Sequence, residues 1–346
     1  MNRPALIKLF IASAVLGGLV GLLSTLFIRT IQEASQIIWT SDYLSFAQNK
    51  PWAVVVIALI GGIGMGLCVK FFGTNDEGIG FESVLVTVEK DGELGVKQLK
   101  RVVINAYLGL ISGASIGPES PLVTIGGICG NYLARLLKTT KEQLMAFITV
   151  ALGGSMGILL DSPVAGPILF AERPPTKNPD TNRVLVFASM VAASMGFGIY
   201  YLLGSPLLKG KELVPAYGNF RLVHLLYGLL IGVVGTAIGI FLKFLIFRFR
   251  SISREKIKWP IVRGALVGLI IGILGAIWPL VLFDGSAQLS HLVANVSHYS
   301  IVMLLTLALV RLITTSVALG GGYQGGNVFP SIFIAGATGL AISALF

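Results

Sequence analysis

The chain is built from long apolar segments that alternate with short polar ones. Apolar residues dominate the stretches 9–30, 51–72, 102–116, 121–137, 143–171, 184–204, 221–247, 261–283, 300–319 and 328–346. A helix of about 18 residues or more is long enough to cross a hydrocarbon core of about 30 Å. Because backbone polar groups must be paired within such a segment, the stretches are expected to be helices. The pattern predicts an all-α membrane protein that crosses the bilayer several times.

The apolar stretches recur in the same order in two halves of the chain. Segment 9–30 corresponds to 221–247, and segment 51–72 corresponds to 261–283. The second segment of each half is followed by a short polar piece that we expect to be a half-helix, at 76–81 and at 284–287. The order predicts two repeats of inverted topology, residues 1–204 and 205–346. The second repeat has no counterpart of 143–204, so we expect a fragment or a chain truncated at its C-terminal end.

Two short motifs occupy corresponding places in these halves. Residues 117–121 read G-P-E-S-P and residues 326–330 read G-N-V-F-P, and both fit the pattern G-x-x-x-P-x-x-x-I. Hydrophobic segments that Gly and Pro interrupt at matching positions of two repeats mark the binding site of a transporter, where broken helices point inward. Helix N-termini carry partial positive charge and unpaired N–H groups. The predicted substrate is therefore an anion.

Charge and composition support a membrane protein over a nucleic-acid-binding one. Only 12% of the residues are charged, against about 25% in soluble domains, and the net charge is +10. The basic residues lie between apolar segments, which is typical of cytoplasmic loops. Arg3 and Lys8 place the N-terminus in the cytoplasm of a cell-membrane protein, and 32–49 is expected outside. The densest basic cluster is expected to be a cytoplasmic loop and contains Lys243, Arg248, Arg250, Arg254, Lys256, Lys258 and Arg263.

Small residues and cysteines have structural interpretations. Glycines at small-x3-small spacing predict close helix packing, and these are Gly62/Gly66, Gly228/Gly232, Gly235/Gly239 and Gly264/Gly268/Gly272. Cys68 and Cys129 both lie in apolar segments, where free cysteine is a small packing residue. No disulfide, metal site or cofactor is expected.

Glu119 is the candidate gating residue. It falls in the first motif, at the expected start of a helix within the membrane. An ionisable residue at that depth is costly and indicates a functional site. A carboxylate there can occupy the anion site and leave when it is protonated or displaced, which makes a gate or a proton carrier. The alternative is a glutamate that only stabilises the helix N-terminus.

At these residues the chain resembles the CLC family of chloride channels and transporters. Residues 117–127 (G-P-E-S-P-L-V-T-I-G-G) are similar to the family element G-R/K-E-G-P-x-V-x-I-G-G, and 325–330 are similar to its G-G-x-F-x-P element. Residues 161–166 (D-S-P-V-A-G) resemble its N-A-P-L-A-G stretch, and 311–315 match the run before the second element. The resemblance covers nearly the whole chain in one order.

The resemblance implies a gate at Glu119 and an anion path lined by helix N-termini. The backbone N–H groups of Asn327 and Val328 would face the anion, and Ser120 stands where the family has glycine. The family's G-S-G-I-P element falls at 76–80, which assigns Glu77, Gly78 and Ile79 to anion binding.

Two positions depart from the family in ways that bear on the transported ion. Glu77 stands at the serine position, and its carboxylate would repel an anion unless it is protonated or turned toward cytoplasmic solvent. The inner glutamate of family exchangers falls at Arg173, with Glu172 just before it. A passive chloride channel, a proton/chloride exchanger and a fluoride-selective exchanger therefore all stay open. The expected partners are chloride or other small anions, protons in an exchanger, the lipid bilayer and, if the missing part is present, a second copy in a homodimer.

An intramembrane serine protease is the alternative from another class. Residues 153–157 read G-G-S-M-G, with Ser155 as the nucleophile that such an enzyme would need. The histidines His224, His291 and His298 are distant in sequence and lie near expected membrane borders. We therefore expect a transport protein and no enzyme, and we interpret the glycines around Ser155 as a packing surface.

Overall fold

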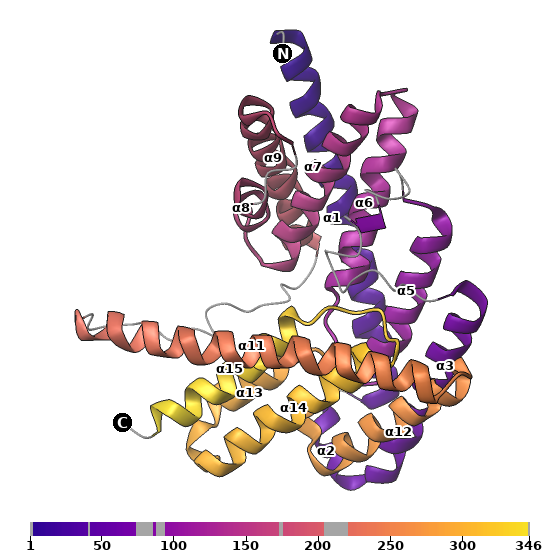
Figure 1. The fold of residues 1–346 in the computed structure, drawn as a ribbon, viewed down its shortest axis with the longest axis vertical. Helices are drawn as coiled ribbons and strands as arrows, with labels where there is room; N and C mark the ends of the chain where they lie inside the picture. Colours follow the sequence, from indigo (N-terminus) through magenta and orange to yellow (C-terminus); the bar gives the residue numbers. More distant parts are fainter. Residues whose placement is uncertain are drawn as a thin grey trace. The chain divides into compact units, whose positions relative to one another are not determined.

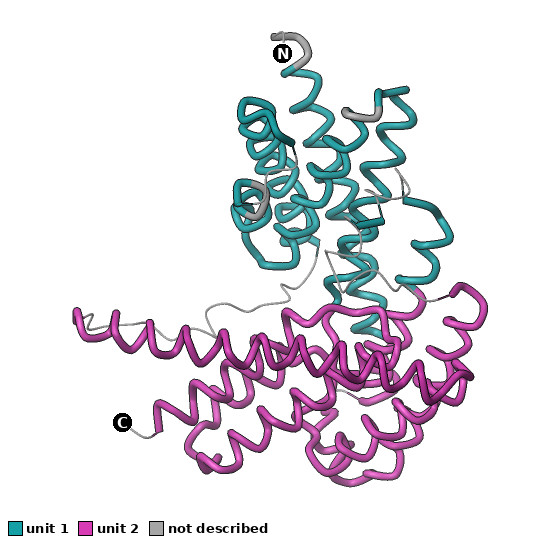
Figure 2. Tube along the Cα trace, in the orientation of Figure 1, with its two compact units in different colours: residues 1–33, 75–103, 118–208 teal, residues 34–74, 104–117, 209–346 magenta. Residues whose placement is uncertain are grey.

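A computed structural model describes residues 3–40, 42–73, 86–87, 94–172, 176–203 and 221–344. The chain divides into two units that interleave along the sequence (Figures 1 and 2). Unit 1 contains 1–33, 75–103 and 118–208, and unit 2 contains 34–74, 104–117 and 209–346. The division into sequence repeats at residue 204 stays a prediction.

Unit 1 is formed by helices from the first part of the chain. They are α1 (Arg3–Trp39) as far as Glu33, the start of α5 (Val96–Ile111), α6 (Glu119–Leu136), α7 (Lys141–Leu159), α8 (Ala165–Glu172) and α9 (Pro179–Leu203). Backbones approach closely where glycine leaves room. A Cβ on Gly17 of α1 would lie 2.1 Å from the Ala192 carbonyl oxygen of α9, and one on Gly130 of α6 would lie 2.7 Å from the Phe147 carbonyl oxygen of α7. Such contacts of small residues are what holds membrane helices together.

Unit 2 contains the remaining helices. They are α2 (Tyr43–Asn49), α3 (Pro51–Phe72), the end of α5, α11 (Val223–Lys256), α12 (Pro260–Ile277), η1 (Pro279–Val281), α13 (Ser286–Ala294), η2 (Val296–His298), α14 (Ile301–Gly321) and α15 (Val328–Ser343). The half-helix expected after residue 283 is present as α13. Its counterpart at 76–81 lies outside the described residues.

The predicted glycine packing holds for one pair of helices. A Cβ on Gly62 of α3 would lie 2.2 Å from the Gly264 carbonyl oxygen of α12, and one on Gly268 would lie 2.2 Å from the Ala58 carbonyl oxygen. On α11 no described atom lies within 4 Å of a Cβ built at Gly228, Gly232, Gly235 or Gly239. Spacing alone predicted close packing for α3, α12 and α11, but it specified no partner for any of them.

Two other expectations about boundaries change. The apolar stretch 143–171 is not one helix, because α7 ends at Leu159 and α8 begins at Ala165, with Asp161 in the left-handed region at φ 47°. The basic residues from Lys243 to Lys256 lie in the last turns of α11 and not in a loop. Arg254 and Lys256 lie in the last turn, where the helix dipole favours cations.

Six helical segments in the described part of the chain are long and apolar enough to cross a membrane. They are Leu6–Asn49, Pro51–Phe72, Pro179–Leu203, Val223–Lys256, Pro260–Ile277 and Ile301–Gly321. The all-α, multi-pass architecture predicted from the hydrophobic pattern is confirmed.

Candidate functional site

The two G-x-x-x-P motifs start their helices in the same register. In α6 the N-cap is Pro118 and the first helical residue is Glu119, so Pro121 is the third. In α15 the N-cap is Asn327 and the first helical residue is Val328, so Pro330 is the third. The first helix-type hydrogen bond also matches, since Leu122 N–H donates to the Pro118 carbonyl at 3.1 Å and Ser331 N–H donates to the Asn327 carbonyl at 2.9 Å.

The prolines fix which backbone donors each helix start can offer. The first turn of a helix has no intrahelical acceptors for its N–H groups, so proline is tolerated there. In the first motif Pro118 and Pro121 carry no N–H, which leaves Glu119 and Ser120 as the residues with backbone donors. In the second motif Asn327, Val328 and Phe329 carry N–H groups, and Pro330 does not. Neither N-cap residue, Pro118 or Asn327, accepts a hydrogen bond from its helix through its side chain.

The segments that lead into the two motifs are joined in unit 2. Gly117 and Gly326 form an isolated antiparallel bridge and exchange two backbone hydrogen bonds, each 2.9 Å long. Ser115 and Thr315 form a buried hydroxyl–hydroxyl hydrogen bond of 2.8 Å. The bridge therefore joins the two segments that precede the motif helices, with Glu119 two residues after Gly117 and Asn327 directly after Gly326.

Asn105 of α5 fixes the second of these segments. Its amide oxygen accepts from the Gln324 N–H at 2.8 Å, and its amide nitrogen donates to the Gly322 carbonyl at 3.2 Å. Gly325 lies against Ile116, and a Cβ on Gly325 would be 2.5 Å from the Ile116 Cβ. The turn before α15 thus has little freedom to move, which preorganises the N-terminus of that helix.

Glu119 is buried, with 2% of its surface exposed. It is the acidic residue in the first turn of α6, and its neighbours Ser120, Pro121 and Leu122 are buried too. A negative charge there interacts favourably with the helix dipole. The Ser120 carbonyl accepts a hydrogen bond from the Thr124 hydroxyl at 2.8 Å, which ties that residue to the next turn.

The remaining predicted site residues fall in different places. Asn327 is partly exposed and Val328 is exposed. Glu172 is exposed at the end of α8, on the C-terminal side of the α7–α8 turn. Glu77, Gly78, Ile79 and Arg173 lie outside the described residues.

Ser155 is a packing residue of α7. Its hydroxyl is fully buried, donates to the Leu122 carbonyl of α6 at 3.1 Å and lies 3.3 Å from the Ala151 carbonyl. It also fills the space above Gly126, where a Cβ would lie 2.0 Å from the Ser155 Oγ. A serine nucleophile needs an adjacent base, and these partners are backbone carbonyls, so the geometry gives the protease alternative no support.

Arg311 is a buried residue whose structural role could not be predicted from the sequence. Its guanidinium donates to the carbonyls of Leu280, Leu282 and Phe283, at 3.3, 2.9 and 2.7 Å. It also lies over the Phe333 ring, 4.9 Å from the centroid. The side chain therefore anchors the segment between α12 and α13, and both of its terminal nitrogens donate to backbone carbonyls. Motif matching indicated that this position matters, but only the fold shows that its partners are carbonyls.

Long apolar helices together with broken helices that start in matched register are typical of a polytopic transport protein. The model of the voltage gated chloride channel family matches residues 61–346. The chain belongs to this family, which confirms the resemblance and the prediction of an anion transport protein, whether channel or exchanger. Family membership gives the coarse function, and the roles of single residues remain proposals.

Known relatives and solved structures agree with this assignment. A proposed ion-transport protein of Escherichia fergusonii, YfeO, is 26% identical over 334 residues, which cover 93% of this chain and 77% of that protein. YfeO of Escherichia coli strain 55989 is 27% identical over 337 residues, 95% of this chain and 78% of that one. A slow cyanobacterial Cl⁻/H⁺ antiporter shares the fold with a TM-score of 0.80 at 22% identity, covering 98% of this chain and 80% of that structure. A CLC-type fluoride/proton antiporter also has a TM-score of 0.80, at 19% identity and with coverage of 100% and 83%.

Proposed function

We propose that this protein moves chloride or a similar small anion across the cell membrane, with backbone N–H groups at the starts of α6 and α15 as anion donors and Glu119 as the gate. The observation that carries the proposal is the matched register of the two helix starts, each of which follows one glycine of the Gly117–Gly326 bridge in the sequence. Duplicated helix breaks of this kind are where transporters bind their substrates.

The chemistry of the helix starts suits an anion that must bind and then leave. Backbone N–H groups of Asn327 and Val328, and of Ser120 in the first motif, offer partial positive charge without a full cation. Conduction requires binding that is favourable enough for entry and weak enough for release. Glu77, Gly78 and Ile79 are assigned to the same path by resemblance.

We propose that Glu119 couples anion movement to proton movement. As a carboxylate at the first position of α6 it competes with the anion for the same N-terminal field. When it is protonated that competition ends, and the anion can pass. Each cycle of release and return can then carry one proton, provided that a second group receives it from the other side.

Proton-coupled exchange is the mode that we favour over a passive channel. Two solved proteins of similar fold are antiporters that move protons, one with chloride and one with fluoride. Glu172 is a candidate for the inner proton acceptor, because it is exposed at the end of α8. Arg173, the next residue, stands where family exchangers have their inner glutamate. Fluoride selectivity is the second candidate, favoured by the similarity to the fluoride/proton antiporter.

The remaining features of the proposal follow from family and sequence. We place the N-terminus in the cytoplasm from Arg3 and Lys8 and divide the chain into repeats at 1–204 and 205–346. A homodimer is the proposed assembly, and the protein is a transporter and not an enzyme.

The test is anion efflux from liposomes that contain this chain, with external pH recorded at the same time. Chloride efflux that drives protons uphill supports the exchanger, and chloride efflux without proton movement indicates a channel. Fluoride in place of chloride tests the second candidate. If neither anion leaves faster than from protein-free liposomes, the proposal is contradicted for this chain.

A further inference from the structure

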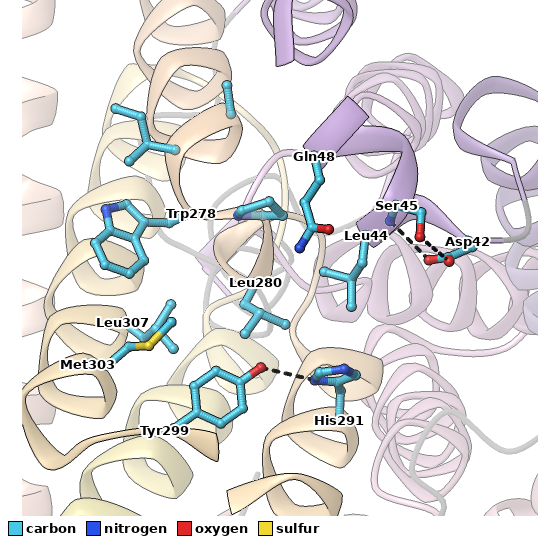
Figure 3. Close-up of a pocket in the computed structure, with 13 residues that line it drawn as sticks. Asp42, Leu44, Ser45, Gln48, Trp278, Leu280, His291, Tyr299, Met303 and Leu307 are labelled. Carbon is cyan, nitrogen blue, oxygen red and sulfur yellow. Dashed lines mark hydrogen bonds between the residues drawn. The ribbon is translucent and has the colours of Figure 1, made fainter. Parts of the chain in front are cut away.

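Unit 2 contains a concave site whose lining residues include none from the two motifs. It is a pocket of about 660 Å³ between α2, the end of α12 with η1, α13 and the start of α14 (Figure 3). This volume lies in the range of small-molecule sites, about 300–1,000 Å³. Its residues lie at the ends of three candidate membrane spans, Leu6–Asn49, Pro260–Ile277 and Ile301–Gly321. We therefore expect the pocket near a membrane border.

One side of the pocket is apolar and aromatic. Leu280 and Leu307 are buried, and Met303 and Trp278 lie beside them (Figure 3). Tyr299 adds a second aromatic ring at the start of α14. Apolar walls with a few placed polar groups are the usual lining of a ligand site, and aromatic faces also attract cations.

The opposite rim carries the charge. Asp42 is the N-cap of α2 and accepts hydrogen bonds from the Ser45 N–H at 3.1 Å and from the Ser45 hydroxyl at 2.5 Å. The Tyr299 hydroxyl forms a 3.4 Å hydrogen bond with His291. Burial raises the pKa of this hydroxyl. Among the residues that line this pocket Asp42 is the acidic one, and none is Lys or Arg. The pocket thus has the wrong sign for the anion that the family transports.

We propose that this pocket binds an amphipathic organic cation, with its ammonium group at Asp42 and its apolar body against Leu280, Leu307 and the two aromatic rings. The negative charge of Asp42 favours the ammonium group, and the apolar wall favours a ligand whose apolar part is larger than a methyl group. The same chemistry is found in small soluble amines and in the headgroups of ethanolamine lipids. The proposal does not depend on the transported anion or on Glu119.

The probe is radiolabelled benzyltrimethylammonium, with binding measured on this chain in nanodiscs made of phosphatidylglycerol alone. The test variant is Asp42→Asn, which removes the charge and keeps a good N-cap for α2. The control is Asp180→Asn, which removes an exposed carboxylate at the start of α9. A third arm replaces the probe by its neutral isostere, neopentylbenzene, as an unlabelled competitor.

We expect saturable binding that Asp42→Asn weakens at least about five-fold, the size of a modest ion or cation–π interaction, and that Asp180→Asn leaves unchanged. The neutral isostere should compete poorly. Nanodiscs with added phosphatidylethanolamine identify the source, since displacement of the probe points to the lipid headgroup and unchanged binding points to a soluble amine. Equal binding to wild type and Asp42→Asn, or equal competition by the neutral isostere, overturns the proposal.

Discussion

Gly117 and Gly326 donate a backbone hydrogen bond to each other, with both N···O distances at 2.9 Å. They are the first residues of two motifs that lie in different halves of the sequence, and both are buried. α6 begins two residues after Gly117 and α15 begins two residues after Gly326, so the pairing joins the segments that lead into both proposed anion-binding helix starts.

The close contact between Gly325 and Ile116 predicts that Gly325→Ala disturbs this pairing. An added Cβ would lie 2.5 Å from the Ile116 Cβ, so the segments must separate, at a cost of about 1–3 kcal/mol. We expect a lower Tm in detergent and a reduced anion flux. Gly339→Ala is the control, because no described atom lies within 4 Å of its Cβ. Equal Tm values for the two variants would show that the junction tolerates separation.

Asn105 gives a second test of the same junction. Asn105→Leu leaves the Gln324 N–H and the Gly322 carbonyl without their side-chain partner, and each buried unpaired group costs about 1–3 kcal/mol. The thermal unfolding of the variant should begin well below that of the wild type. Thr306→Val removes an exposed hydroxyl that bonds only within α14 and should change Tm little. A wild-type Tm in Asn105→Leu would refute the bridging role.

Arg311→Met tests the anchor of the segment before α13. The substitution removes the donor to three carbonyls, and we expect a loss of about 3 kcal/mol or more. The measurement is denaturant unfolding compared with Arg183→Met, since Arg183 is exposed and forms an ion pair with the exposed Asp180 at 3.5 Å. An equally small effect for both would mean that Arg311 does not hold this segment.

Ser155→Ala separates a packing role from a nucleophilic one. Because the hydroxyl bonds to the Leu122 carbonyl, its removal should lower stability by about 1 kcal/mol while anion flux persists. Efflux from liposomes and Tm are measured on the same preparation. Complete loss of flux at an unchanged Tm would assign Ser155 a direct role that packing does not explain.

The sequence predicted the helices well because membrane spans leave a strong hydrophobic pattern. It also predicted the two motif helices, since Gly and Pro mark a helix start by backbone chemistry alone. The break between α7 and α8 was missed although Asp161, Ser162 and Pro163 interrupt the apolar stretch there, because the apolar residues on either side fit a single helix; Asp161 adopts the left-handed conformation in the turn.

Long-range contacts could not be predicted from the same pattern. The Gly117–Gly326 bridge needs two loops from distant parts of the chain, and nothing local in either one specifies the other. The same holds for Arg311, whose carbonyl partners belong to a segment before α13. Glycine spacing predicted close packing for α3, α12 and α11 alike. The structure brings α3 and α12 together, while the α11 glycines have no described atom within 4 Å of an added Cβ, because spacing allows close approach without specifying the partner.

The central claim is that Glu119 is the gate and proton carrier, and Glu119→Gln tests it most directly. The variant keeps the size of the side chain and removes its charge, and Glu33→Gln is the control at an exposed position of α1. Chloride efflux and external pH are recorded together from liposomes. We predict that Glu119→Gln still passes chloride but moves no protons and loses its dependence on pH, while Glu33→Gln behaves as the wild type. Wild-type proton movement and pH dependence in Glu119→Gln would contradict the account.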